Sequence, residues 1–286
     1  MSASAAARLI DAQLDGPVLT VDATVSRPLF GVTELWTYHE LLYFLTVRDL
    51  KVRYKQTALG VIWIVMQPLL FTLVFTIFLG HVARVDSGGI PYPVFAYAAL
   101  LPWSFFSSAV ANGAGSLVGS AHLITKVYFP RLVIPTAAVA ARLVDVAISL
   151  ALLGVMMVWY RIAPTRNLFM IPPLLAVTGL LALALGTWLS AVNVRYRDVG
   201  VMVPVMLQVW MFVSPVVYSS RSVPAKWHAL YILNPLVGLI ENFRTAVFGG
   251  AFDWPAFTVS VVCAVALLLE AARMFRATER GFADVI

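Results

Sequence analysis

A dense group of charged residues precedes the first long apolar run of this sequence. Arg48, Asp49, Lys51, Arg53 and Lys55 lie within eight positions, and the next titratable side chain after them is His81. Side chains of this kind can bind anionic headgroups at a membrane surface. Because Lys and Arg accumulate at the cytoplasmic ends of membrane-spanning helices, the group predicts a cytoplasmic anchor in front of a first span.

A second pair of charged residues, Arg142 and Asp145, lies inside an apolar stretch. Residues three apart share one face of a helix. Ionisable residues at membrane depth are costly and usually face the interior of the protein. We favour a mutual structural pair over contact with a substrate.

The composition predicts an integral membrane protein. Of the 286 residues, 61% are hydrophobic and only 12% are charged, whereas about a quarter are charged in soluble domains. The formal net charge of +6 does not indicate nucleic-acid binding, because the basic residues lie at the ends of apolar runs.

Motifs for covalent chemistry are missing from the sequence. It contains no Walker A pattern, no H-E-x-x-H and no G-x-S-x-G, so it cannot hydrolyse a nucleotide by the P-loop route. Its single cysteine, Cys263, forms neither a disulfide framework nor a Cys-x-x-Cys metal site. We expect no catalytic residue, no metal and no cofactor in this chain.

The predicted fold is an all-α membrane domain with six spans. A loose tail, 1–33, precedes an amphipathic interfacial helix, 34–57, in which Tyr43, Val47, Leu50 and Tyr54 recur at helical spacing. The spans lie within 58–275, at about 59–79, 93–118, 132–159, 168–194, 199–218 and 254–269. Two short re-entrant or interfacial helices are expected at about 219–253, and a C-terminal segment follows at 276–286.

The distribution of Lys and Arg predicts the orientation. With six spans, the termini and the segments 119–131 and 195–198 lie on one side and hold 13 Lys and Arg, whereas the other side holds 6. This asymmetry places both termini in the cytoplasm.

Four stretches of this sequence resemble a known family of membrane proteins. The stretch R-D-L-K-V-R-Y-K-Q-T-A-L-G-V-I-W-I-V-M-Q-P-L at 48–69 resembles the membrane subunits of type 2 ABC transporters that export polysaccharides or polyol phosphates, such as O-antigen, capsule or teichoic acid. N-V-R-Y-R-D-V at 193–199, S-P-V-V-Y at 214–218 and N-P at 234–235 are similar to the family in order and spacing.

The resemblance implies a permease in the bacterial cytoplasmic (inner) membrane that moves a lipid-linked glycan. It implies a homodimer docked on two copies of a separate ATPase subunit, which binds the ATP and Mg. A cytoplasmic coupling helix would lie at about 120–129, with His122, Lys126, Tyr128 and Phe129 as contacts. Arg48, Lys51, Arg53 and Lys55 would then also face the ATPase and a lipid phosphate at the substrate entrance.

Two further groups follow from this family. Aromatic residues in spans are ordinarily packing or interfacial belt, but a pore for sugars would also use aromatic faces, and the candidates are Trp63, Trp103, Phe105, Phe106, Trp188 and Trp210. The external helices would gate the exit, with Asn234, Pro235, Glu241 and Arg244 in that region.

Other functions stay open on sequence grounds. A type 2 exporter of lipids or drugs is the nearest alternative, and the basic anchor and the 193–199 motif favour the glycan branch. A membrane-embedded glycosyl or acyl transferase would need carboxylate clusters at an interface, where this sequence is mainly basic. A passive channel or a structural scaffold would not bind an ATPase.

Overall fold

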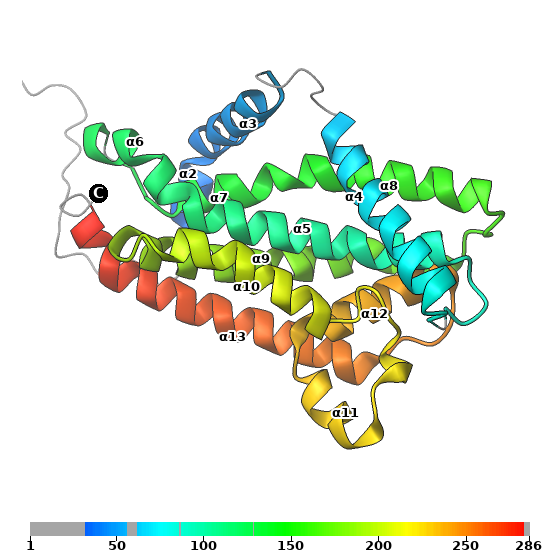
Figure 1. The fold of residues 1–286 in the computed structure, drawn as a ribbon. Coiled ribbons are helices and arrows are strands. Elements are labelled where there is room, and N and C mark those ends of the chain that lie inside the picture. The colour runs from blue at the N-terminus through cyan, green and yellow to red at the C-terminus, as the bar shows by residue number, and fades with distance from the viewer. Residues whose placement is uncertain (1–31, 56–61, 86, 128, 283–286) are drawn as a thin grey trace, which may run out of the picture.

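The computed structural model describes residues 32–55, 62–85, 87–127 and 129–282. Throughout these residues all regular structure is helical, and no strand occurs. The long helices lie roughly side by side around α5 (Tyr92–Gly119), which packs against α9 (Ile171–Arg195), α7 (Val133–Ala140) and α8 (Arg142–Trp159) (Figure 1). The buried aromatic and aliphatic side chains of α5 form the centre of the main core.

Five segments among the described residues are long and apolar enough to cross a membrane. They are Val65–Val82, Tyr92–Gly119, Val133–Trp159, Arg166–Arg195 and Trp254–Thr278. The predicted span at 199–218 is shorter in the structure: α10 comprises only Val199–Val213, about 22 Å at 1.5 Å per residue. It ends because Ser214 is extended (φ −103°, ψ 154°) in front of Pro215, and a residue before proline disfavours the helical conformation.

The first span is irregular. It begins with α4 (Ile62–Phe75), which contains Pro68, and continues as a π-helix, η1 (Thr76–Val82). A proline inside a helix removes one backbone hydrogen bond, which is tolerated in a span when neighbouring groups compensate. Most of α4 lies on the surface, and its exposed side chains are almost all apolar.

The predicted N-terminal helix is divided at Tyr38 into α2 (Val32–Thr37) and α3 (His39–Lys55). On α3, Tyr43 of the predicted apolar face is 66% exposed, whereas Leu45 is only 6% exposed. Leu45 packs with Ile134 and Phe129 in a small core at one end of the bundle. The predicted loose tail lies almost entirely outside the described residues.

Small residues bring α5 and α9 into close contact. A Cβ atom at Gly113 would lie 2.9 Å from the Cα atom of Gly186. Since real Cβ contacts of that length essentially never occur, this crossing needs glycine at position 113. A Cβ atom at Gly186 would lie 3.3 Å from the Cα atom of Gly113, which is a tight contact.

Two short helices precede the last long one. They are α11 (Ala225–Ile232) and α12 (Pro235–Phe248), and α13 (Trp254–Thr278) follows. The last span was expected to end at about residue 269, but the helix that contains it, α13, ends at Thr278. Along the part beyond residue 269, the pairs Arg273–Glu270 (3.8 Å) and Arg276–Glu279 (3.7 Å) have helical spacing.

The bundle has two distinct ends (Figure 1). We call the end that holds α3, α6 (Ala121–Lys126) and the end of α13 the α6 end, and the opposite end the α12 end. Near the α6 end, Phe282 is 3% exposed and its ring lies 5.4 Å from that of Phe275. The expected C-terminal segment is therefore packed as far as residue 282.

Candidate functional site

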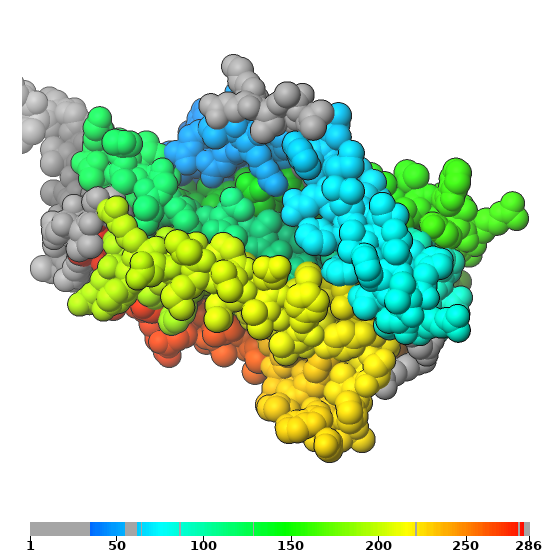
Figure 2. All heavy atoms as spheres, viewed as in Figure 1, coloured from blue at the N-terminus to red at the C-terminus, as the bar shows by residue number. Residues whose placement is uncertain are grey.

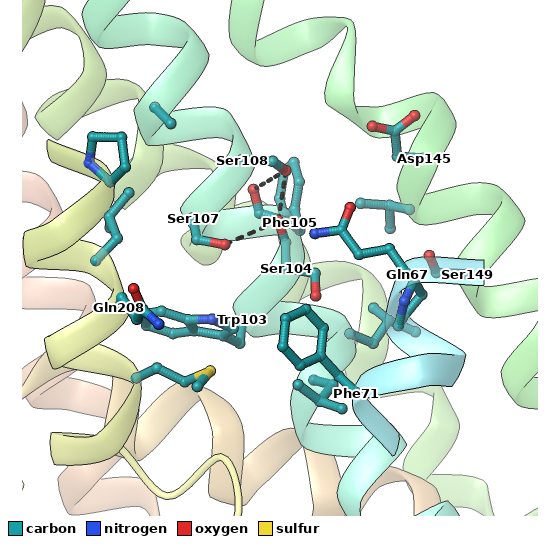
Figure 3. A pocket seen from close by; sticks show the side chains of 18 of the residues that line it. Gln67, Phe71, Trp103, Ser104, Phe105, Ser107, Ser108, Asp145, Ser149 and Gln208 are labelled. Atoms are coloured by element: carbon teal, nitrogen blue, oxygen red, sulfur yellow. Dashed lines mark hydrogen bonds between the residues drawn. The ribbon is translucent and has the colours of Figure 1, made fainter. Parts of the chain in front are cut away.

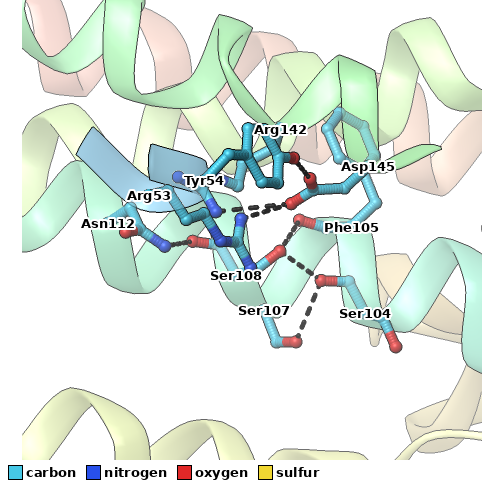
Figure 4. Close-up of polar contacts among 9 residues, drawn as sticks. All are labelled: Arg53, Tyr54, Ser104, Phe105, Ser107, Ser108, Asn112, Arg142 and Asp145. Atoms are coloured by element: carbon cyan, nitrogen blue, oxygen red, sulfur yellow. Dashed lines mark hydrogen bonds and ion pairs between the residues drawn. The ribbon is translucent and has the colours of Figure 1, made fainter. Parts of the chain in front are cut away.

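Asp145 on α8 is the centre of a charged cluster beside α3. Its carboxylate accepts hydrogen bonds from Arg53 (2.5 Å), Tyr54 (2.6 Å) and Arg142 (3.3 Å) (Figure 4). The predicted pair of Arg142 and Asp145 is present. It is not a mutual pair, however, because Asp145 binds two residues of α3 at shorter distances.

The cluster joins the interfacial helix to the membrane domain. Burial of the Tyr54 hydroxyl, together with its hydrogen bond to Asp145, raises the pKa of Tyr54. The hydroxyl therefore remains protonated and donates to the carboxylate. Among the predicted entrance residues, Arg53 and Arg48 line cavities and Lys51 is exposed, whereas the Lys55 side chain lies outside the described part of the structure.

A polar stripe runs along α5 and faces away from its core side. Its polar members, Ser104, Ser107, Ser108 and Asn112, lie on one face with the small residues Ala111, Gly115 and Gly119. All seven residues are half-buried or exposed, in contrast to the buried residues of the opposite face, such as Phe106, Val110 and Ala114. The hydroxyls of Ser107 and Ser108 and the Asn112 amide bond to backbone carbonyls of the same helix. These side chains therefore have hydrogen-bond partners within α5, and they still present polar atoms on its surface.

The part of this stripe from Ser104 to Ala111 forms the floor of a cavity of about 360 Å³, the α5 cavity. Gln67 of α4 and Gln208 of α10 line opposite walls, and Ser104 and Ser108 lie between them (Figure 3). Figure 2 shows the hollow on the face of the molecule between α4 and α10. Polar side chains therefore gather at membrane depth on a groove that is open on one side.

A second cavity, of about 620 Å³, continues the groove toward the α6 end and is called here the α3 cavity. Both cavities are lined by Arg53 and Ala111, so they adjoin at these residues. The lining of the α3 cavity includes Arg48, Asp49 and Arg142. The groove therefore combines polar and apolar side chains in its middle and is basic at one end.

The predicted pore aromatics fall into three groups. Trp103 and Phe105 line the α5 cavity. Phe106 is fully buried, edge-on to Trp210 at 5.4 Å, so both pack in the core rather than on the groove. Trp63 and Trp188 are 52% and 38% exposed and line neither cavity.

Arg244 is the centre of a second charged cluster, at the α12 end. Its guanidinium donates to the carbonyls of Val216 (2.9 Å) and Tyr218 (2.9 Å) and to Glu241 (3.3 Å). It also lies 3.8 Å from the centre of the Phe95 ring. Glu241 in turn accepts from the backbone N–H of Ser220 (2.8 Å), so the cluster fixes the 214–220 turn against α12 and α5.

Two asparagines of the sequence motifs hold the chain in place. Asn193 donates to the Ala114 carbonyl and accepts from the Gly200 N–H, both at 3.0 Å. Asn234 caps α12 by accepting from the Leu236 N–H, accepts from the Trp210 indole (3.1 Å) and donates to Ser214 (2.9 Å). Both motifs have a structural role here.

The expected coupling segment contains the short helix α6, in which His122 and Lys126 are exposed. The expected contact at Phe129 needs correction, because its side chain is 7% exposed in the core at the α6 end. Tyr128 lies outside the described residues. Arg131 holds the segment by donating to the Glu279 carbonyl.

The polar stripe of α5 and its partners Gln67 and Gln208 were not predicted from the sequence. A signal was present, since polar residues at 104, 107, 108 and 112 have helical spacing inside an apolar run. The hydrogen bond from Tyr54 to Asp145 had no such signal, because 91 residues separate the two.

Comparison with known proteins identifies the family of this chain. Its residues 40–248 match the family described as ABC-2 type transporter. The chain is 32% identical to the O-antigen export system permease protein RfbA of Myxococcus xanthus, over 89% of this chain and 98% of that protein. A protein of the same name from Klebsiella pneumoniae is 28% identical, over 86% and 95%.

A more distant relative matches a smaller part of the chain. The polysialic acid transport protein KpsM of Escherichia coli is 24% identical, over 72% of this chain and 80% of that protein. With the five apolar segments, these matches describe a multi-pass protein of the bacterial inner membrane. The chain belongs to the ABC-2 type transporter family.

Proposed function

We propose that this chain is the permease subunit of an ATP-driven exporter that moves a polysaccharide, linked to a lipid, across the cytoplasmic membrane. Similarity to permeases named for O-antigen export and polysialic acid transport supports the substrate class. The observation that carries the transport role is the groove along α5, which is lined by three arginine and two glutamine side chains.

The groove supports a homodimer. Polar groups at membrane depth face protein or water rather than lipid, and this groove is open between α4 and α10 (Figure 2). The rims carry exposed apolar side chains, such as Val205, Val209 and Leu73, which a second copy would bury. Two grooves facing each other would enclose a path with polar walls.

The α6 end is the proposed cytoplasmic side. Several basic residues lie there, as Lys and Arg do on cytoplasmic loops: Lys126 belongs to α6, Arg131 bonds to Glu279 at the end of α13, and Arg195 ends α9. Both termini then lie in the cytoplasm. His122 and Lys126 of α6 would contact the partner ATPase, which binds the ATP and Mg.

The α12 end is then external. With α10 of 15 residues as a sixth, short span, the hairpin of α11 and α12 would re-enter the membrane from outside. The Arg244 cluster would hold this hairpin to α5, and Asn234 would hold it to the end of α10. We propose that these contacts make the hairpin a rigid frame around the exit.

Reconstitution tests the proposed function. The chain and its co-purified ATPase, placed in proteoliposomes with a lipid-linked glycan, should move the glycan only when ATP is hydrolysed. For the dimer, Cys263→Ala gives a background without cysteine, in which Val209→Cys on α10 should form a cross-linked dimer. Val155→Cys, on the exposed face of α8, is the matched control and should stay monomeric.

Transport without any ATPase would contradict the exporter assignment. Equal cross-linking of Val209→Cys and Val155→Cys would contradict the proposed dimer interface. The exporter assignment would not be affected, because only the transport assay tests it.

A further inference from the structure

The α3 cavity has an excess of positive charge. Three arginines and one carboxylate line it, namely Arg48, Arg53, Arg142 and Asp49. Neutral donors are present on its α5 side: Asn112, Ser116 and Ser120. Arg48 itself bonds to both Asp49 (2.8 Å) and Ser120 (3.4 Å). This combination of fixed cations and hydroxyls is suited to an anion with several oxygen atoms.

Arg142 is the most unusual member of this lining. Only 5% of it is exposed, and its Nε has no hydrogen-bond partner among the described residues. Its contact with Asp145 is long, at 3.3 Å, whereas charge-assisted hydrogen bonds are usually 2.7–2.9 Å. A buried donor without a partner is rare, and in a native structure it calls for an explanation.

Asp145 does not fully compensate Arg142. Its carboxylate is occupied by Arg53 at 2.5 Å and Tyr54 at 2.6 Å, both of which come from α3. The same carboxylate therefore attracts two of the cavity's three arginines. An anion that enters the cavity would compete with Asp145 for Arg53 and Arg142.

We propose that the α3 cavity binds a phosphate or diphosphate group, with Arg142 as its buried anchor and Arg48 and Arg53 as its outer contacts. A guanidinium presents two parallel N–H groups that match two phosphate oxygens. This inference rests on the proposed function for the source of the group, which would be the headgroup of a lipid-linked substrate. The site lies where the interfacial helix meets the groove, so a headgroup bound there would be placed at its basic end.

Asp145 is then a competing counter-ion, and this distinguishes the proposal from a purely structural role. Neutralising Asp145 frees two arginines for the anion and should tighten its binding. In a structural network, the same change would loosen the cluster and weaken any binding that depends on it. The two roles predict opposite signs.

A binding assay separates these cases. The full-length chain, with any subunit that co-purifies with it, is placed in phosphatidylcholine nanodiscs and titrated calorimetrically with farnesyl diphosphate, inorganic diphosphate and farnesol. Arg142→Gln should weaken farnesyl diphosphate binding about tenfold, as expected for the loss of a charged hydrogen bond. Asp145→Asn should tighten it severalfold. Arg273→Gln, an arginine whose side chain is 64% exposed on α13, is the matched control and should bind like the wild type.

Several results would overturn the proposal. Equal binding by Arg142→Gln and Arg273→Gln would remove Arg142 as an anchor, and weaker binding by both Arg142→Gln and Asp145→Asn would mean a structural network. Farnesol binding as tight as that of its diphosphate would exclude phosphate recognition. Inorganic diphosphate binding as tightly as the farnesyl form would overturn the lipid source.

The assay does not depend on transport. Arg142-dependent binding in a chain that fails to export would refute the proposed function and leave the site. Export by a chain whose binding ignores Arg142 would refute the site and leave the function.

Discussion

Two buried arginines of this molecule, one on α12 and one on α8, differ in how their charge is compensated. Arg244 and Arg142 are 4% and 5% exposed. Arg244 has three acceptors within 3.3 Å and an aromatic ring 3.8 Å away. Arg142 has one long bond to a carboxylate that is shared with α3, and an Nε without a partner in the described structure.

This difference indicates that the Arg244 cluster is a structural scaffold and that the Arg142 cluster is a binding site. Removing one partner of a buried charge costs more than the pair itself contributes, because the remaining charge stays desolvated. A cluster that saturates its cation, as around Arg244, therefore stabilises one conformation. A cluster that leaves donors unsaturated beside a cavity is prepared for a ligand.

The largest effect is expected for Arg244→Gln. This substitution leaves Glu241 without its cation and two carbonyls of the 214–220 turn without donors, which should cost about 3–5 kcal/mol of unfolding free energy. Thermal unfolding of the purified chain in detergent measures it. Arg273→Gln, on the surface of α13, is the control; if both variants melted at the same temperature, the Arg244 cluster would not be a scaffold.

A smaller effect on stability is expected for Arg142→Gln. Asp145 keeps Arg53 and Tyr54 as partners, so the unfolding free energy should fall by only about 1 kcal/mol, while glycan export in proteoliposomes falls about tenfold or more. The comparison between the two arginines would fail if Arg142→Gln unfolded as easily as Arg244→Gln.

The groove itself offers a third test, in which stability should hardly change. Ser108→Leu places a bulky apolar group on the floor of the α5 cavity and should slow export about tenfold, since the side chain points into the proposed path. Ser108→Ala removes the same hydroxyl without adding bulk, and the surface change should lie within about 0.5 kcal/mol. Equal export by the two variants would argue against a substrate path along α5.

Features of the fold and of the candidate site that depend on neighbouring residues could be predicted from the sequence. Features that depend on residues far apart in the sequence could not. Apolar length and proline positions predicted four of the long helices closely, because spans follow from local composition. The end of α10 at Val213 was missed, although Ser214-Pro215 is a local signal. Asn193 and Asn234 belong to motifs that resemble the family. Their hydrogen bonds to Ala114 of α5 and Trp210 of α10 could not be predicted, because they depend on how these helices pack.

The two arginines show the same division. The pair Arg142–Asp145 could be predicted because its members are one helical turn apart, whereas the contribution of α3 could not, since Arg53 lies 92 residues from Asp145. Arg244 was expected only as part of an external gate. Its carbonyl partners are backbone atoms of a turn, and residue types do not reveal where a turn folds back.

The smallest predicted effect tests the link between α3 and the site. Tyr54→Phe removes one hydrogen bond to Asp145 and should cost about 1 kcal/mol, too little to unfold the chain. Its effect should be local: hydrogen exchange should speed up in α3 and stay unchanged in α12. Asp145 would then be held by the two arginines alone and would compete for them more strongly, so farnesyl diphosphate should bind slightly less tightly. Faster exchange in both helices would mean that the two clusters are coupled, and the division between scaffold and site would not hold.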